Sequence, residues 1–197
     1  MPPSNSPSQS SSLSQLLEES GAILHGHFKL SSGRHSDVYF EKFRILERPD
    51  VLSILCGEIA NHFRHSAIEY IVGPTTGGII IAFEVGRQLG LPARYVESEN
   101  GKKLLRRRAS IPAGGRVLVV DDILTTGLSL IETRQAVEEI GATVIGYGVL
   151  IDRSQDFVSS VPLFAAHRVD AVSYAEEEIP DWLAQIPIEK PGTRSQK

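Results

Sequence analysis

One stretch, Val117 to Ser129, limits the possible folds of this chain more than any other. It starts with four apolar, mostly β-branched residues, Val117–Val120, which are typical of a strand buried on both faces in a parallel sheet. Asp121 and Asp122 follow where we expect that strand to end. The small and hydroxylated residues Thr125–Gly127 then lead into a helical pattern. The stretch therefore predicts a strand–loop–helix unit with two carboxylates at the end of the strand.

The predicted helix carries its own start signal, because Ser129 and Glu132 have the spacing of a capping box. A tight turn rich in backbone N–H groups at a helix N-terminus forms an anion-binding cradle. Two adjacent Asp side chains at the carboxyl end of a central strand suit a sugar diol or a metal ion. The alternative is a strand that ends in two solvated acids before an ordinary helix. The added Thr-Thr-Gly sequence favours a phosphate site.

A second segment repeats this order. Tyr70–Gly73 predicts another buried strand, followed by the Thr- and Gly-rich turn Pro74–Gly78 and the apolar helix Ile79–Leu89. Backbone N–H groups near Gly77 are open to an approaching anion, because glycine has no side chain, although such a turn is a weak signal by itself. Strands alternate with helices along the chain, so we expect an α/β fold with a doubly wound parallel sheet.

Composition excludes several classes of protein. With 197 residues, 41% hydrophobic and 22% charged, the chain fits one globular domain. A formal net charge of −4 does not favour nucleic-acid binding by the chain as a whole. The single cysteine, Cys56, permits no internal disulfide and lies in an apolar helical pattern typical of a core thiol. Without a membrane-length apolar run or a secretory signal, we expect a cytoplasmic protein.

The ends of the chain differ from its middle. Residues 1–12 are almost all Ser, Pro, Gln and Asn, which predicts a disordered tail. We expect residues 13–197 to form a single domain, with a hood at about 13–40, a core at about 49–154 and a C-terminal segment at about 155–197. The hood is predicted to contain a short helix and then two short strands around a Ser-Ser-Gly-Arg turn.

Lys102–Arg108 is a basic run with five cations in seven positions of an otherwise acidic chain. It follows an Asn-Gly pair and lies between two predicted strands. A solvated surface, a nucleic-acid patch and a mobile anion-binding flap are all consistent with such a run. The flexible Asn-Gly pair and the position between strands favour the flap.

Together these motifs resemble those of type I phosphoribosyltransferases. Asp121–Ser129 is similar to the loop with which that family binds phosphoribosyl pyrophosphate (PRPP), where two acids hold the ribose hydroxyls and the loop wraps the 5′-phosphate. The Pro74–Gly78 turn is similar to the family's pyrophosphate loop. The resemblance implies that PRPP is bound by Asp121, Asp122, Ile123, Leu124, Thr125, Thr126, Gly127, Leu128, Ser129, Thr76 and Gly77.

The hood and the pair Asp152-Arg153 resemble orotate phosphoribosyltransferases in particular. An Arg at the carboxyl end of a strand is a natural bidentate partner for a planar carboxylate, although an Asp-Arg surface pair is the alternative. The resemblance implies orotate binding by Thr125, Arg153, Tyr39 and Phe40, and catalytic roles for Asp121, Asp122, Lys102 and Lys103.

This family makes orotidine 5′-monophosphate and pyrophosphate from orotate and PRPP, so the resemblance implies a pentosyltransferase of de novo pyrimidine biosynthesis. It also implies Mg²⁺ carried by PRPP rather than by the protein, and a homodimer whose basic flap acts in trans at the neighbouring site. A purine-type phosphoribosyltransferase and a non-catalytic regulator that binds PRPP or RNA are the alternatives.

The chain departs from the family pattern at several positions. Many orotate enzymes carry cations where this chain has Ser31, Gly77 and Glu97-Ser98, and many family members carry a second Gly at Leu128. The flap cations, Lys102, Lys103 and Arg106–Arg108, are expected to supply the missing charge.

Overall fold

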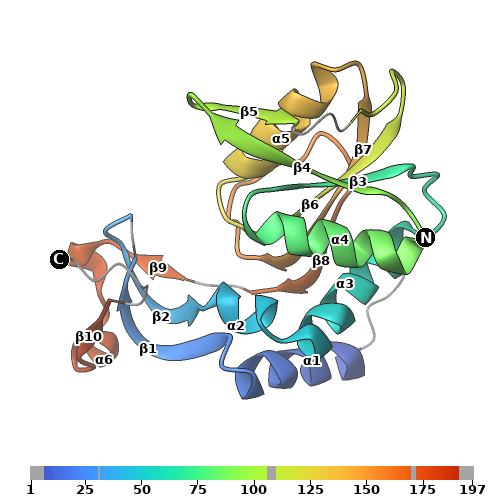
Figure 1. Ribbon diagram of the computed structural model, residues 1–197. Helices are drawn as coiled ribbons and strands as arrows, with labels where there is room; N and C mark the ends of the chain where they lie inside the picture. The colour runs from blue at the N-terminus through green and yellow to red at the C-terminus, as the bar shows by residue number, and fades with distance from the viewer. Residues whose placement is uncertain (1–6, 31, 106–109, 170–171, 191–197) are drawn as a thin grey trace. The chain divides into compact units, whose positions relative to one another are not determined.

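The protein is described by a computed structural model that covers residues 7–30, 32–105, 110–169 and 172–190 (Figure 1). The described residues form two compact units. One unit runs from Leu52 to Val169, and the other combines the residues before Leu52 with those after Val169. In this described part of the chain, no helix is long and apolar enough to cross a membrane.

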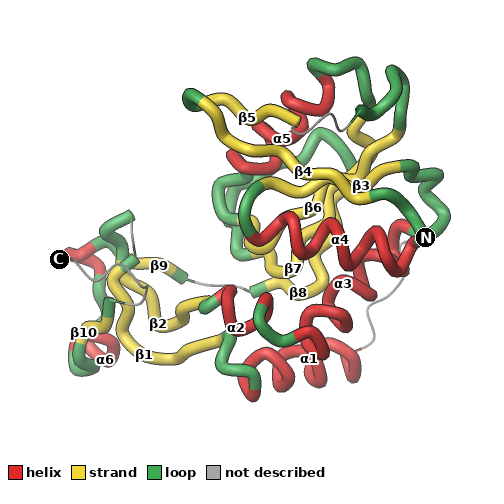
Figure 2. Tube along the Cα trace, viewed as in Figure 1, coloured by secondary structure: helices red, strands yellow, loops and turns green. Residues whose placement is uncertain are grey.

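The Leu52–Val169 unit is built on a six-stranded sheet of order β5-β4-β3-β6-β7-β8 (Figure 2). Neighbouring strands are parallel, except that β5 pairs antiparallel with β4. The long strand β6 therefore lies inside the sheet, between two parallel neighbours. The strands are β3 (Tyr70–Pro74), β4 (Ala93–Glu99), β5 (Lys102–Leu105), β6 (Arg116–Leu124), β7 (Thr143–Asp152) and β8 (Leu163–Arg168).

Three helices cover the sheet: α3 (Pro49–Phe63), α4 (Gly77–Leu89) and α5 (Leu128–Glu138). The connection from β3 through α4 leads to β4, and the connection from β6 through α5 leads to β7 in the opposite direction along the sheet. Because such crossovers are right-handed, they place α4 and α5 on opposite faces (Figures 1 and 2). The predicted doubly wound sheet is confirmed.

Both faces of β6 are buried, as its apolar run predicts. Val117 and Val119 belong to the core cluster that also contains Val137 of α5. Val120 lies on the other face, where α3 presses closely against β7. A Cβ added at Gly148 would lie 2.6 Å from Cγ2 of Ile59 and 3.4 Å from Cγ1 of Val120. Strand alternation therefore assigns successive β6 side chains to opposite faces of the sheet.

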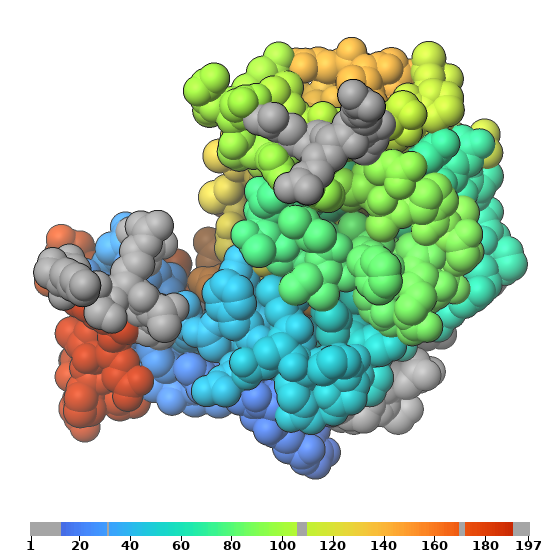
Figure 3. Space-filling model, viewed as in Figure 1, coloured from blue at the N-terminus to red at the C-terminus, as the bar shows by residue number. Residues whose placement is uncertain are grey.

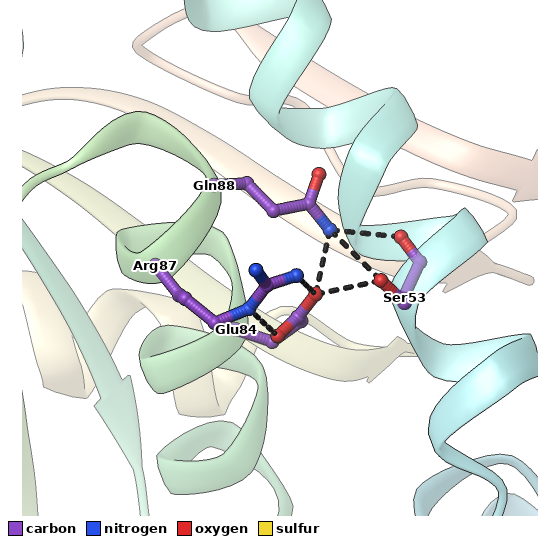
Figure 4. A network of polar contacts seen from close by, with 4 residues as sticks. All are labelled: Ser53, Glu84, Arg87 and Gln88. Atoms are coloured by element: carbon purple, nitrogen blue, oxygen red, sulfur yellow. Dashed lines mark hydrogen bonds and ion pairs between the residues drawn. The ribbon is translucent and has the colours of Figure 1, made fainter.

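A polar network joins α3 to α4 (Figure 4). The Ser53 hydroxyl donates to Glu84 Oε1 at 2.8 Å, and Gln88 Nε2 donates to the same oxygen at 2.7 Å. Arg87 donates two further bonds to Glu84, both 2.8 Å long. These bonds, chiefly those from Arg87, lower the pKa of Glu84 to about 2. A charged carboxylate therefore fixes α4 against α3.

The other unit contains a four-stranded sheet of order β10-β1-β2-β9. Two of its strands come from the C-terminal segment, which the sequence did not assign to the hood. The strands are β1 (Ile23–Lys29), β2 (His35–Phe40), β9 (Ser173–Tyr174) and β10 (Ile188–Glu189). The remaining elements are α1 (Pro7–Glu19), α2 (Lys42–Leu46), the 3₁₀ turn η1 (Glu176–Glu178) and α6 (Asp181–Ala184).

The helix α1 begins at Pro7 rather than at Leu13. The predicted disordered tail is therefore wrong for residues 7–12, and residues 1–6 lie outside the described part of the chain. Ser, Gln and a proline in the first turn are all tolerated in a short helix, so composition alone misplaced its start.

A pair of buried histidines links this sheet to the C-terminal segment. Nε2 of His27 lies 2.7 Å from Nδ1 of His35, and Nδ1 of His27 lies 3.1 Å from the carbonyl oxygen of Ile186. That carbonyl can only accept, so Nδ1 of His27 carries the proton, and in the neutral pair Nε2 of His27 accepts from His35. The two rings are 2% and 1% exposed. The hydrogen bonds of His27 therefore tie β1 and β2 to the residues that follow α6.

Candidate active site

Two loops that were predicted from the sequence lie at the same edge of the six-stranded sheet. β3 and β6 are adjacent and parallel, with Val72 opposite Val119. Each strand leads directly into a loop and a helix, β3 into α4 and β6 into α5. The carboxyl ends of adjacent parallel strands in such a sheet are where ligands bind. The β6–α5 loop forms a pocket.

This pocket has a volume of about 280 Å³. It is lined by Asp121, the residues from Ile123 to Leu130, and Glu132. Thr125 and Thr126 are exposed at the turn, whereas Gly127 is buried. The predicted PRPP-binding residues are thus neighbours around one concave surface, with the exception of Asp122 and of the two residues on the β3–α4 loop.

The two aspartates do not stand at the end of a strand as expected, because β6 continues to Leu124. Asp121 is 7% exposed and Asp122 is 9% exposed, so both are buried rather than facing solvent. Each oxygen Oδ1 accepts a bond from the next backbone N–H, at 2.8 Å for Asp121 and 2.7 Å for Asp122. Strand alternation separates the carboxylates, and Asp121 is the one on the α5 face that lines the pocket.

The surroundings of Asp121 shift the pKa of its carboxyl group. Burial raises the pKa of this carboxyl to about 6, and the neighbouring Asp122 charge adds to the increase. A hydrogen bond from Ser129, the backbone N–H of Asp122 and the Lys103 charge all act in the opposite direction. The carboxylate is therefore ionised at neutral pH but protonates at a pH where an ordinary Asp would still be charged.

The turn into α5 depends on Gly127. Its φ of +78° lies in the left-handed region that favours glycine, and it is the N-cap of α5. A Cβ at this position would lie 2.0 Å from a ring carbon of Phe157. Both the backbone conformation and the packing thus require glycine, and Phe157 is a residue of the site that the sequence analysis missed.

The predicted capping box is wrong. α5 starts at Leu128 and has no side-chain cap at its N-terminus. Ser129 is inside the helix, where its hydroxyl accepts a bond from Nζ of Lys103 at 2.7 Å. The capping-box spacing was present, but the glycine turn already sets where the helix begins.

The start of the predicted flap is also different from the expectation. Residues 99–105 are not a flexible loop but a hairpin in which Glu99 pairs with Lys102 across Asn100-Gly101. Both turn residues have positive φ, 52° and 79°. Lys102 and Lys103 lie on β5 and form ion pairs within the same chain, Lys102 with Glu139 at the C-cap of α5 and Lys103 with Glu132 of α5. The predicted flap residues Arg106–Arg108 lie outside the described residues.

The β3–α4 loop contains Thr76 and Gly77, the other predicted PRPP ligands. Thr76 is exposed and is the N-cap of α4, and Gly77 is its first residue. The next glycine, Gly78, is needed for packing, since a Cβ there would lie 2.5 Å from Cδ of Pro74. Contact of this loop with a diphosphate stays a prediction.

Arg153 lies directly beside the β6–α5 loop. Its backbone N–H donates to the carbonyl of Leu124 at 3.0 Å. The preceding Asp152 is 1% exposed and accepts a 2.6 Å bond from Nη2 of Arg168, so the alternative of an exposed Asp152-Arg153 pair does not hold for this carboxylate. Bonds from Ser154 and Arg168 outweigh burial and lower the pKa of Asp152. The sequence analysis missed Arg168, although it ends a strand parallel to β7.

Tyr39 and Phe40, the predicted aromatic contacts of orotate, belong to the other unit. Phe40 is 4% exposed and is part of the core of that unit. The ring of Tyr39 lies 5.6 Å from the ring of Phe28. Their contact with a base stays a prediction, as does that of Thr125.

Among the described residues, no three His, Cys, Asp or Glu side chains are grouped so as to hold a metal ion. Cys56 is fully buried in α3, and burial raises the pKa of its thiol to about 12. This thiol is a core residue, as its sequence context predicts.

Comparison with known proteins agrees with this geometry. The family described as "Phosphoribosyl transferase domain" matches residues 45–160. Orotate phosphoribosyltransferase of Chlorobaculum parvum is 45% identical over 181 residues, which cover 91% of this chain and 94% of that protein. The protein of the same name from Pelotomaculum thermopropionicum is 46% identical over 180 residues, covering 91% and 95%.

A solved structure shows the same fold. The crystal structure of orotate phosphoribosyltransferase from Aeropyrum pernix superposes with a TM-score of 0.70 at 30% identity, covering 80% of this chain and 93% of that one. The chain therefore belongs to the phosphoribosyltransferase family, and within that family to the orotate phosphoribosyltransferases. The family and fold expected from the sequence are confirmed.

Proposed function

We propose that the pocket formed by the β6–α5 loop binds PRPP, and that the chain transfers its 5-phosphoribosyl group to orotate, giving orotidine 5′-monophosphate and pyrophosphate. The observation that carries this proposal is the pocket itself, in which a buried carboxylate stands beside a glycine turn at a helix N-terminus. Such a turn offers backbone N–H groups to a phosphate. The names of the relatives favour orotate over the purine and regulator alternatives.

Different residues of the β6–α5 loop would bind different parts of PRPP. Thr125, Thr126 and Gly127 take the 5′-phosphate, and Asp121 takes the ribose hydroxyls, with Asp122 assisting from the neighbouring position. Breaking the C1–oxygen bond puts positive charge on the ribose ring, and a preorganised carboxylate stabilises that charge. No side-chain nucleophile is required. Positioning and fixed charge supply the rate enhancement.

Mg²⁺ would enter with PRPP, held by the diphosphate oxygens, and would neutralise charge on the leaving group. The β3–α4 loop with Thr76 and Gly77 is adjacent to the β6–α5 loop, which supports a diphosphate contact there. Arg153 would bind the carboxylate of orotate. Its backbone bond to Leu124 supports this role, because it holds Arg153 next to the residues that receive the ribose.

We also propose a homodimer in the cytoplasm. Two large apolar side chains on α4 are exposed, Ile80 at 41% and Phe83 at 65%, and α4 lies at the surface shown in Figure 3. Exposed apolar side chains of this size favour an interface. Arg106–Arg108 would reach the neighbouring site in such a dimer. A free, buried Cys56 is consistent with a reducing compartment.

An assay of orotate consumption tests the proposed function. The purified chain is mixed with PRPP, Mg²⁺ and either orotate, adenine or hypoxanthine, and pyrophosphate release is followed. We expect release with orotate and almost none with the purines. Release with a purine alone, or PRPP binding without release with any base, would contradict the proposal.

A further inference from the structure

Asp152, the last residue of β7, is a buried carboxylate with four hydrogen bonds. Its oxygen Oδ1 accepts from the backbone N–H of Ser154 at 2.9 Å and from the Ser154 hydroxyl at 2.6 Å. Oδ2 accepts from Nε of Arg168 at 3.1 Å and from Nη2 of the same guanidinium at 2.6 Å. A carboxylate has about four acceptor sites, so these bonds occupy all of them. Asp152 can therefore act on a substrate only through its neighbours.

The bonds to Ser154 enclose Arg153. An Asp side chain that accepts from the backbone N–H two residues further on forms an Asx turn, and Arg153 is the central residue of this one. The backbone N–H of Arg153 also donates to the carbonyl of Leu124 at 3.0 Å. Since the backbone sets the direction in which a side chain leaves it, these bonds fix where the Arg153 side chain begins.

Arg168 holds the carboxylate from the other side. It ends β8, whose register places Arg168 opposite Asp152 on β7. The carbonyl of Asp152 accepts from the backbone N–H of Val169 at 2.9 Å, so the two strand ends are joined by backbone as well as side-chain bonds. Bonds between a guanidinium and a carboxylate are charge-assisted and directional. The pair therefore fixes the plane of the carboxylate, and with it the position of the oxygen that Ser154 contacts.

We propose that Asp152 is a positioning residue for Arg153: supported by Arg168, it holds the turn from which Arg153 reaches the carboxylate of orotate. This inference rests on the proposed function, in which Arg153 binds that carboxylate. A bidentate contact between a guanidinium and a carboxylate needs both groups aligned in one plane, so a displaced turn weakens it.

Two substitutions interrupt this support at different points. In Asp152→Asn the amide keeps one acceptor oxygen, which can serve Ser154 or Arg168 but not both. The Arg168 side chain is 71% exposed, so its guanidinium can turn to water and the variant leaves no buried cation unpaired. Arg168→Gln removes the charged partner and leaves the Asp152 turn in place. We expect both variants to fold.

Glu84 provides a matched control. It is a carboxylate of the same unit that also accepts four bonds, one from Ser53, one from Gln88 and two from Arg87 (Figure 4). Its side chain is 13% exposed, and its bonds join α3 to α4 rather than support Arg153. Glu84→Gln therefore reproduces the loss of a bonded carboxylate without touching the turn. It should lower the melting temperature but leave both KM values near those of wild type.

Steady-state pyrophosphate release, with each substrate varied in turn, measures the effect. Asp152→Asn should raise the KM for orotate about 10–100-fold, the scale known for outer partners that orient a metal-binding side chain. Arg168→Gln should raise it less, and the KM for PRPP should change little in either variant. Equal changes in the two KM values of Asp152→Asn would overturn the proposal, because they would show a general defect of the fold.

A double-mutant cycle with Arg153→Ala is the sharper test. If Asp152 acts through Arg153, adding Asp152→Asn to Arg153→Ala should lower kcat/KM for orotate only slightly further. The full effect of Asp152→Asn in that background would overturn the proposal. Thermal unfolding shows that each variant is folded, and Arg168→Gln takes the place of Asp152→Asn in the cycle if the latter is not.

The same assay separates this inference from the proposed function. If the wild type releases no pyrophosphate with orotate, the proposed function is overturned, and this inference with it. Normal release by the wild type together with independent effects of Asp152→Asn and Arg153→Ala would overturn the inference alone.

Discussion

Among single residues, Asp121 is the one whose buried surroundings oppose the charged form that the proposed function requires. Burial favours its neutral form, yet contact with ribose hydroxyls and with a cationic ring needs the charged form. The protein resolves this conflict with a serine hydroxyl, a backbone N–H and a lysine. A pKa of about 6 leaves the carboxylate ionised at neutral pH but with little margin.

We predict that kcat/KM for PRPP rises with pH through about 6 in the wild-type enzyme, since the carboxyl is protonated below that value. The effect on stability has the opposite sign. The folded-state pKa lies above the ordinary value of 3.8, so this group favours the fold most below pH 4 and loses that contribution as pH rises through 6.

Asp121→Asn should abolish the rise of kcat/KM for PRPP with pH. It should also lower turnover by about 10²–10³-fold, the usual loss for one preorganised group. Asp156→Asn, at an exposed position of the same unit, serves as the control. A variant at Asp121 with near-normal turnover and an unchanged profile would remove this carboxylate from the mechanism.

Arg153→Ala should raise the KM for orotate far more than the KM for PRPP. The loss of a bidentate contact with a carboxylate costs about 2–5 kcal/mol. Steady-state kinetics with each substrate varied in turn measure the two effects, with Arg64→Ala at an exposed position of α3's C-terminal end as control. Equal changes in both constants would mean that Arg153 does not face the base.

In the β6–α5 loop, backbone conformation and packing restrict the residue type at Gly127 more than a direct contact with substrate does. Gly127→Ala would force a side chain into a left-handed residue and against the ring of Phe157. We expect loss of PRPP binding, measured by calorimetry, and a stability loss of at least about 1 kcal/mol. Gly114→Ala is the matched control, because φ there is +79° but no atom lies within 4 Å of the added Cβ.

Phe157→Ala in the Gly127→Ala background separates the two causes. Removing the ring relieves the contact but not the backbone strain, so binding should return in part. If the double variant binds no better than Gly127→Ala, strain alone explains the loss.

The hood sheet depends on the protonation of its buried histidine pair. Burial lowers the pKa of His35, and the charges of His27 and Lys29 add to that effect, while Glu176 opposes it. A depressed histidine pKa contributes stability that is present above about 6.5 and is lost as pH falls below it. A proton on the pair would also leave a buried N–H at Nε2 of His35, which has no partner among the described atoms.

We therefore predict that the melting temperature of this unit falls between pH 7.5 and pH 5, as followed by thermal unfolding. His35→Gln should flatten that dependence, whatever its effect on absolute stability. His25→Gln, whose side chain is 64% exposed, should leave it in place. An unchanged slope in His35→Gln would show that another group is responsible.

The strand β6 and the turn into α5 were predictable because each has a strong local signal, a β-branched run and a Thr-Thr-Gly turn. The hairpin before β5 also had a signal, since Asn-Gly with positive φ at both residues is the preferred two-residue turn between strands. The Asn-Gly pair was instead interpreted as the flexible start of a flap, together with the position of the basic run between two predicted strands. The histidine pair joins residues distant in sequence and leaves no local pattern.

At the scale of the whole molecule, the basic side chains of Lys102–Arg108 act either at the pocket of their own chain or at the pocket of a second copy. We predict that Asp121→Asn refolded together with a variant carrying Ala at Arg106, Arg107 and Arg108 recovers roughly a quarter of wild-type activity, since half the dimers then hold one intact pocket and one intact flap.

Size-exclusion chromatography must first show that mixed dimers form. No recovery in the mixture would mean that the basic run does not act between copies.

The division of the chain was the least predictable feature. The parallel sheet was predictable, because its central strands are long enough to show an apolar pattern. β9 and β10 have two residues each, too few for any periodicity, so their place in the hood sheet was missed. In the C-terminal segment, Trp182 is 51% exposed, whereas the adjacent Leu183 is fully buried.

The interrupted hood has a consequence for biogenesis. A ribosome completes every strand of the six-stranded sheet before it makes β9 or β10, which pair with β2 and β1. The hairpin of β1 and β2 emerges first. The four-stranded sheet to which it belongs cannot be completed until the intervening unit has been synthesised. Until then, both of its edges present unpaired backbone groups, the kind of surface that chaperones protect. Folding in the cell must therefore run out of chain order, with the middle of the polypeptide maturing before its beginning.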